Sequence, residues 1–153
     1  MINETPMERN DLSYGIIPLF RSGNQCIQLL IQDHHGNWGF PKGHPKEGET
    51  GFETALRELY EETGITDCNL LPGISFTDNY QYTAENGDKV NKTVTYYLAA
   101  VNDPRIEQKD TDGEIKATLW ADAETALKTL TFENRKKLIN EVQQYLHSQN
   151  LIQ

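Results

Sequence analysis

The sequence predicts a single mixed α/β domain, in which helices pack against a β-sheet. Runs of β-branched and aromatic residues alternate with turn-forming residues over much of the chain, a pattern typical of strands. Two other segments, one in the middle of the chain and one at its end, repeat apolar residues at the spacing of an amphipathic helix. With 153 residues, 37% of them hydrophobic, the chain has the size and composition of one domain with one core.

The first strands are predicted over residues 14–20 and 26–31, separated by a turn at residues 21–24. Residues 34–48 are rich in Gly, Pro, His and Lys, so this segment is predicted to be a loop. The helix that follows is predicted to begin at Thr50, which with Glu53 has the spacing of a capping box, and to stop at Gly64. Its apolar residues define one buried face: Phe52, Ala55, Leu56 and Leu59.

The second half of the chain is predicted to contain three strands, over residues 70–76, 93–101 and 117–120. The first of them is expected to be broken near Pro72-Gly73, and Asn86-Gly87 indicates a hairpin before the second. A short helix is predicted over residues 122–128. A longer one is predicted from about residue 131 to residue 148, with this apolar stripe: Leu138, Ile139, Val142, Tyr145 and Leu146.

The charge balance limits the classes of partner. Lys and Arg number 14 and Asp and Glu number 23, which gives a net charge of −9. Such a surface disfavours membranes and long nucleic acids, which are held mainly by excess positive charge. A phosphate substrate stays possible, because bound divalent cations invert the local sign of the charge.

The ends and the cysteines predict a protein of the cytoplasm. Residues 1–11 are polar, lack the apolar region of a signal peptide, and are expected to form a flexible N-terminal arm before a single domain at residues 12–150. Cys26 and Cys68 form neither a disulfide framework nor a metal-binding CxxC pair. We therefore expect two reduced thiols.

Three carboxylates on the first helix have the spacing of a metal site. Glu58, Glu61 and Glu62 stand at i, i+3 and i+4, so they share one flank of the helix, although like charges at these spacings destabilise it. With Glu49 in the preceding loop they offer the oxygen ligands that suit Mg²⁺ (or Mn²⁺). The alternative is a solvated acidic face without function, which is common for acidic runs.

The whole segment 43–65 resembles the Nudix box, G-x5-E-x7-R-E-U-x-E-E-x-G-U, in which U is a bulky aliphatic residue. Nine residues occupy its specified positions without insertion: Gly43, Glu49, Arg57, Glu58, Leu59, Glu61, Glu62, Gly64 and Ile65. The resemblance implies a Nudix-type α/β/α sandwich with a mixed sheet, and a metal-dependent hydrolase of nucleoside diphosphates linked to another group. By the same resemblance, Glu58, Glu61, Glu62 and the Gly43 carbonyl would hold the metal, and Glu49 and Arg57 would orient them.

Three segments outside the box resemble the asymmetric diadenosine-tetraphosphate hydrolases. They are the W-x-x-P-K-G-H run at residues 38–44, the K-T-V-x-Y-x-L run at residues 92–98, and Glu114, six residues before Trp120. This resemblance implies cleavage of diadenosine tetraphosphate to ATP and AMP, with Glu114 as an additional carboxylate near the metal. The P-K-G segment also occurs in RNA 5′-pyrophosphohydrolases, so that activity, on short RNA 5′ ends, is the alternative. A nucleotide-binding sensor without turnover is a third possibility.

The remaining site residues are assigned by their chemistry. Lys42, His44 and Lys92 are expected to bind phosphates of the substrate, and Lys42 is held between a proline and a glycine. Tyr80 and Tyr82 are the candidates for stacking on adenine, with Tyr82 preferred.

The candidates for the catalytic base are Glu58, Glu62 and Glu114. Of the oligomeric states, we expect a monomer, with a dimer as the alternative.

Overall fold

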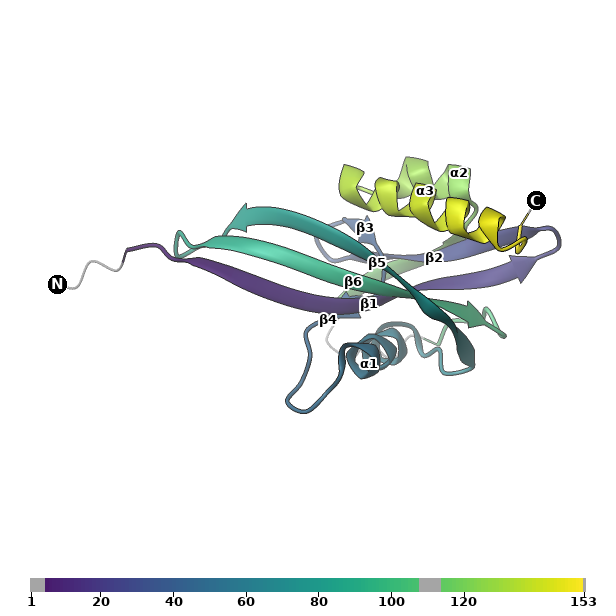
Figure 1. Cartoon of the computed structure of the whole chain (residues 1–153), viewed down its shortest axis with the longest axis horizontal. Coiled ribbons are helices and arrows are strands. Elements are labelled where there is room, and N and C mark those ends of the chain that lie inside the picture. Colours follow the sequence, from purple (N-terminus) through teal and green to yellow (C-terminus); the bar gives the residue numbers. More distant parts are fainter. Residues whose placement is uncertain (1–4, 108–113, 153) are drawn as a thin grey trace.

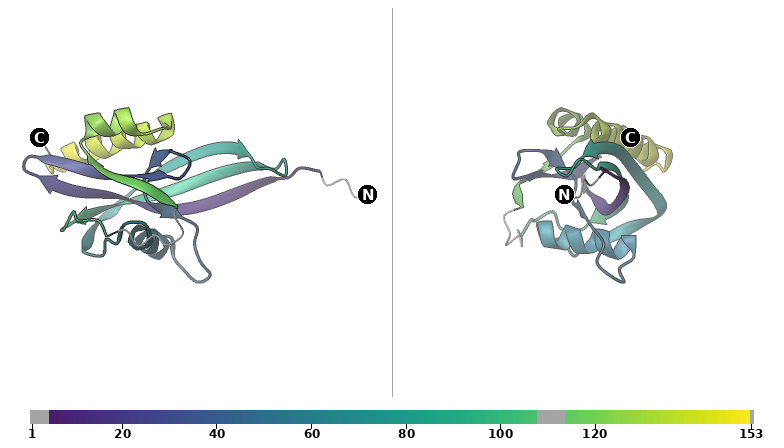
Figure 2. Two further views of the ribbon diagram at one scale, coloured as in Figure 1. Left: turned by 180° about the vertical axis from the view of Figure 1, so that it is seen from behind. Right: turned by 90° about the vertical axis from the view of Figure 1, so that its left-hand side faces the viewer.

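The structure is a three-layer α/β/α sandwich built on one mixed β-sheet, as predicted. The computed structural model describes residues 5–107 and 114–152. Within them, α1 covers one face of the sheet, and α2 and α3 cover the other (Figures 1 and 2). The elements in chain order are β1 (Glu8–Ser22), β2 (Gln25–Asp33), β3 (Trp38–Gly39), β4 (Lys42–Gly43), α1 (Gly51–Thr63), β5 (Cys68–Thr83), β6 (Lys89–Val101), β7 (Ile115–Ala121), α2 (Ala123–Thr129) and α3 (Glu133–Ser148).

The long strand β1 lies at the centre of the sheet. It pairs in parallel with β6, from Glu8 opposite Lys89 to Leu19 opposite Ala100, and antiparallel with β2 and β4. The hairpin of β5 and β6 is antiparallel and places β5 at one edge of the sheet, and β7 pairs with β2. Because β4 pairs with β1 directly before the loop that leads into α1, the sheet positions this loop.

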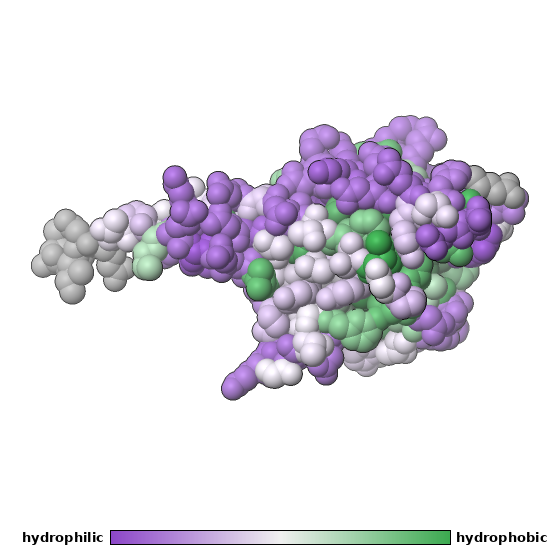
Figure 3. All heavy atoms as spheres, viewed as in Figure 1, coloured by the Kyte–Doolittle hydropathy of each residue, from purple (hydrophilic) through white to green (hydrophobic). Residues whose placement is uncertain are grey.

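Two apolar cores lie on the two faces of the sheet. Neighbouring residues of a strand point to opposite faces, so Ile16 packs in the core under α1 and Ile17 in the core under α2 and α3. Leu29 and Leu30 in β2 divide in the same way. Hydrophilic side chains cover α3 and the projecting strand ends, whereas apolar side chains gather over the lower half of β5 (Figure 3).

The strands are longer than the sequence patterns indicate. Residues 8–11, expected in the N-terminal arm, belong to β1, where the parallel pairing with β6 holds them. Arg9 also pairs with Asp88 at 3.3 Å, and Asn91 donates to the Glu8 carboxylate at 2.9 Å. The turn between β5 and β6 is confined to a few residues around Gly87, whose positive φ of 89° suits glycine.

Helix α1 begins and ends where the sequence predicts. The Thr50 side chain accepts from the Glu53 backbone N–H while Glu53 accepts from the Thr50 N–H, which is the expected capping box. Gly64 ends the helix with a φ of 78°.

None of the helices in the described parts of the chain is long and apolar enough to cross a membrane.

Candidate active site

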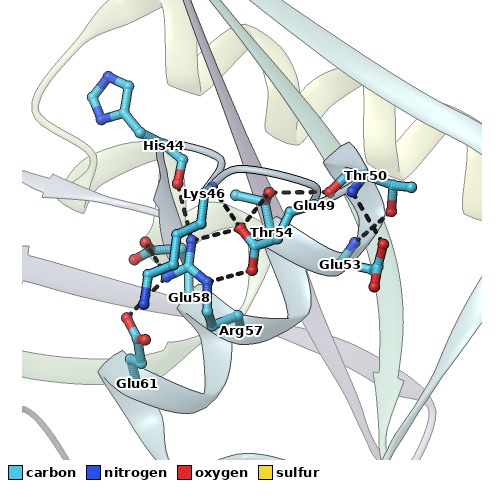
Figure 4. Close-up of polar contacts among 9 residues, drawn as sticks. All are labelled: His44, Lys46, Glu49, Thr50, Glu53, Thr54, Arg57, Glu58 and Glu61. Carbon is cyan, nitrogen blue, oxygen red and sulfur yellow. Dashed lines mark hydrogen bonds and ion pairs between the residues drawn. The ribbon is translucent and has the colours of Figure 1, made fainter.

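Arg57 holds together the acidic flank of α1 and the loop before it (Figure 4). Its Nε and Nη2 donate to the two oxygens of Glu49 at 2.6 and 3.0 Å, a bidentate pair. Its Nη1 donates to Glu58 at 3.0 Å and to Glu61 at 3.2 Å. A further bond from Nη2 to the His44 carbonyl, at 2.9 Å, ties the start of the loop to the helix. One guanidinium therefore fixes two carboxylates of the acidic flank relative to the loop.

Glu49 receives hydrogen bonds from both sides of the loop. The Lys46 backbone N–H donates to it at 2.8 Å, and the Thr54 hydroxyl donates at 3.0 Å. The hydrogen bonds from Arg57 and Lys46 lower the pKa of Glu49 to about 2, so the carboxylate stays charged. The same contacts with Glu49 raise the pKa of Arg57. Glu49 thus has the position expected of a residue that orients the acidic flank.

Glu62 is a buried carboxylate on the flank of α1, and its contacts with Lys42 do not offset the cost of burying its charge. Its side chain belongs to a residue that is only 8% exposed, and its Oε2 has no hydrogen-bond partner among the described residues. Burial, and then the negative charge of Glu58, raise the pKa of Glu62 to about 9. Glu114 adds to this repulsion, and burial also raises the pKa of Glu58. A cation bound between these carboxylates would offset both the cost of burying their negative charges and the repulsion between them.

The donor set therefore fits a divalent cation, although the ligands are not assembled around one point. Among the described residues, no group of three or more His, Cys, Asp and Glu side chains has the geometry of a metal site. In this structure the Glu58 and Glu61 carboxylates accept hydrogen bonds from the Arg57 guanidinium instead. Hard carboxylate oxygens on one helix flank are nevertheless the ligands that Mg²⁺ prefers.

Gly43 allows the loop to lie directly against the acidic flank. A Cβ built at Gly43, in β4, would collide with the carboxylate of Glu58, whereas a Cβ at Gly39, in β3, would meet nothing within 4 Å. Any side chain at position 43 would therefore displace the Glu58 carboxylate from its present position.

We expect Gly43→Ala to displace the Glu58 carboxylate and to weaken binding of Mn²⁺ by at least about tenfold, as disturbance of a metal site commonly does. Titration calorimetry with Mn²⁺ measures this loss, and Gly39→Ala is the matched control. Equal Mn²⁺ affinities of the two variants would show that the close contact at Gly43 is not needed.

Two clefts meet beside these carboxylates. The first has a volume of about 400 Å³ and contains the aromatic residues Trp38, Tyr80 and Phe132 as well as Glu62. The second has a volume of about 420 Å³ and a polar lining of Ser13, His44, Lys46 and the acidic flank. Lys42 and Glu114 line both clefts. A ligand with an aromatic end and a charged chain could therefore lie across the two.

Lys42 is suited to hold an anion where the clefts meet. Burial, and then the positive charges of Lys92 and Arg135, lower the pKa of its side chain. Among the described residues, none makes a hydrogen bond or ion pair of 4.0 Å or less with its ammonium group. The phosphate oxygens of a bound ligand would accept hydrogen bonds from this ammonium group.

The structure revises the expected placement of two substrate-binding residues. Lys92 is not one of the residues that line the two clefts, because its ammonium group is directed to Asp11 and Ser13. Tyr82 lies on the same face of β5 as Tyr80 but closer to the hairpin turn, and it lines neither cleft. Tyr80, the less favoured candidate, lies on the wall of the first cleft.

Arg135 and Phe132 are cleft residues that the sequence did not reveal. The Arg135 guanidinium carbon lies 5.2 Å from the centroid of Tyr80 and 4.8 Å from that of Phe132. Its charge is balanced by Asp78, a buried residue of β5, at 3.7 Å. The helical periodicity placed Arg135 on α3, but only the packing of α3 on β5 brings it to the cleft.

The chain is similar to known proteins over most of its length. A model of the NUDIX domain family matches residues 9–142 of the chain. The asymmetrical bis(5'-nucleosyl)-tetraphosphatase of Rattus norvegicus is 38% identical over 122 residues, which cover 78% of this chain and 80% of the rat protein. The RNA pyrophosphohydrolase of Bartonella bacilliformis is 42% identical over 78 residues, which cover 46% of each chain.

Solved structures share the fold. The structure of a binary complex of the Caenorhabditis elegans Ap4A hydrolase matches 90% of this chain and 98% of that chain, with a TM-score of 0.77 and 25% sequence identity. The NUDIX domain of Shewanella oneidensis NrtR, solved with ADP ribose, matches with a TM-score of 0.69 at 18% identity, over 94% of this chain and 90% of that chain. The second similarity concerns the fold alone.

Proposed function

The chain belongs to the Nudix hydrolase family, whose model matches most of its length, and from this premise we propose that it cleaves diadenosine tetraphosphate to ATP and AMP. The family generally uses a divalent metal ion such as Mg²⁺. The names of the rat tetraphosphatase and the worm Ap4A hydrolase support the choice of substrate.

The observation that carries the proposal is the junction of the two clefts at Lys42 and Glu114. An aromatic cleft suits a nucleobase, because base stacking on an aromatic side chain contributes about 1–3 kcal/mol. A polar cleft with His44 and Lys46 suits a chain of phosphates. A dinucleoside polyphosphate has both parts, and its phosphates would pass beside Glu58 and Glu62.

We assign the metal to the acidic flank and its neighbours. Glu58, Glu61 and Glu62, together with Glu114 and the Gly43 carbonyl oxygen, would hold Mg²⁺ or Mn²⁺. When bound, the ion supplies charge neutralisation at the phosphate oxygens and lowers the pKa of a bound water. The Oε2 atom of Glu62 supports this assignment, because it is buried without a hydrogen-bond partner among the described residues and a bound cation would offset the cost of burying this charge.

The chain's own groups would divide the remaining tasks. Lys42 and His44 bind phosphates that do not react, and one of Glu58, Glu62 and Glu114 accepts the proton of the attacking water. Tyr80, together with Phe132, provides the surface for a base. Arg57 is a positioning residue, because its donors are directed to Glu49, Glu58 and Glu61 rather than to substrate.

A comparison of substrates tests this choice. Values of kcat/KM are measured with Mg²⁺ for diadenosine tetraphosphate and for a short 5′-triphosphorylated RNA, under equal conditions. We expect the dinucleotide to be preferred by at least about tenfold, because an RNA brings further phosphate charges to a protein whose net charge is −9. Preference for the RNA would support the alternative activity, with which the Bartonella relative is consistent. Saturable binding of both without product would instead indicate a nucleotide sensor.

A further inference from the structure

A cluster of four polar side chains from three segments lies behind the second cleft. Asp11 and Lys92 are directly opposite each other in the parallel pair of β1 and β6, and Ser13 is two residues beyond Asp11. The Lys92 Nζ donates to the Asp11 carboxylate at 2.8 Å and to the Ser13 hydroxyl at 2.6 Å. The His44 Nε2 lies 3.0 Å from Asp11 Oδ1 and 3.2 Å from Lys92 Nζ.

The cluster has a buried part and a part that faces the cleft. Lys92 is 5% exposed and Ser13 is 1% exposed, whereas the His44 side chain is 65% exposed. His44 lines the second cleft, and Asp11 and Lys92 do not. Ser13 also lines that cleft but is buried, so the exposed His44 imidazole is the side chain through which the Asp11–Lys92 pair can act most directly on a ligand there.

His44 is held at two points. Its carbonyl oxygen accepts from Arg57 at 2.9 Å, and its ring contacts Asp11 at 3.0 Å. The first contact fixes the backbone of the loop, and the second limits the rotation of the imidazole. Without Asp11, the ring would lose its anchor and Lys92 would become an unpaired buried cation.

We propose that Asp11 is a positioning residue, which with Lys92 holds the His44 imidazole in place to bind phosphate in the second cleft. The inference rests on the proposed function only in that His44 contacts phosphate. Lys92 then acts behind the cleft, as the partner that keeps Asp11 charged and aligned, and not as a direct phosphate ligand.

A double-mutant cycle tests this role without turnover. The dissociation constant of inorganic tripolyphosphate is measured by calorimetry for the wild type, Asp11→Asn, His44→Ala and the double variant. We expect each single change to weaken binding about tenfold, the value of one charge-assisted hydrogen bond. The double variant should bind no more weakly than His44→Ala, because Asp11 acts through His44. Multiplied effects, unchanged binding by Asp11→Asn, or no binding by the wild type would overturn the inference.

Two further variants distinguish the proposed role of Asp11 from an effect on folding. The double change Asp11→Asn with Lys92→Met leaves no unpaired buried charge, and it should still weaken binding as His44→Ala does. Asp88→Asn removes an ion pair between the turn directly before β6 and Arg9 of β1, and it should leave the tripolyphosphate affinity unchanged. Equal losses in Asp88→Asn and Asp11→Asn would assign the effect to strand pairing and overturn the positioning role.

Kinetics then separate this inference from the proposed function. Asp11→Asn should raise the KM for diadenosine tetraphosphate about tenfold and change kcat less than about twofold. If the wild type cleaved no dinucleotide while the binding cycle behaved as expected, the proposed function would fail and the role of Asp11 would stand.

Discussion

Glu62→Gln is expected to lower kcat at least about a hundredfold while the protein stays folded. Glutamine has nearly the shape of glutamate but lacks the charge that a metal ion requires. Glu62 Oε2 has no hydrogen-bond partner among the described residues, and burial raises the pKa of this carboxyl group to about 9, so the native fold gains little from its charge. Removing the charge should leave the free energy of unfolding equal or higher.

Steady-state kinetics with Mg²⁺ and thermal unfolding without metal measure the two effects. The matched control is Glu124→Gln on α2, whose side chain is 80% exposed and lies in an exposed i,i+4 pair with Lys128. That variant should keep its activity. A Glu62→Gln protein with full kcat would remove Glu62 from the metal site and from the candidates for the base.

Arg57→Met is expected to affect both activity and stability. The change removes five hydrogen bonds to four residues of the loop and the helix. It also leaves the neighbouring negative charges of Glu49, Glu58 and Glu61 without the positive charge that balances them. We expect a loss of about 2–3 kcal/mol in the free energy of unfolding, and a fall in kcat of at least about a hundredfold because the carboxylates lose their alignment.

Urea unfolding and steady-state kinetics measure these losses. Arg105→Met is a suitable control, because Arg105 also makes a bidentate pair, with Asp103, but its side chain is 86% exposed. An exposed pair contributes little, so the control should be indistinguishable from wild type. If Arg57→Met were as stable as this control, the guanidinium would not be the organising centre of the site.

The local features of the site were predictable from the sequence. Thr50, Glu53 and Gly64 set the limits of α1 through contacts with neighbours in the chain. The helical period then placed Glu58, Glu61 and Glu62 on one flank. The predicted interaction of Arg57 with Glu49 is also present, since the two residues lie close in sequence.

Features that depend on distant segments were not predictable in this way. The pairing of residues 8–11 with β6 joins segments about eighty residues apart, and no periodicity within either segment indicates it. The same pairing places the Lys92 ammonium group against Asp11, a contact that neither segment indicates by itself. Arg135 and Phe132 reach the first cleft only because α3 packs against β5.

Tyr80 and Tyr82 show the limit of strand periodicity. Both residues lie on one face of β5, so alternation treats them alike. Their distance from the hairpin turn decides which of them lies beside Arg135, and this depends on where α3 begins over the sheet. A sequence that predicts the face of a strand does not by itself predict the position along it.

The most direct test of the central claim is a chromatographic analysis of the products that the wild-type protein forms from diadenosine tetraphosphate with Mg²⁺. We predict ATP and AMP in equal amounts, and no product when EDTA is present or when Glu62→Gln replaces the wild type. Formation of ADP alone would contradict asymmetric cleavage. The absence of any cleavage would contradict the choice of this substrate.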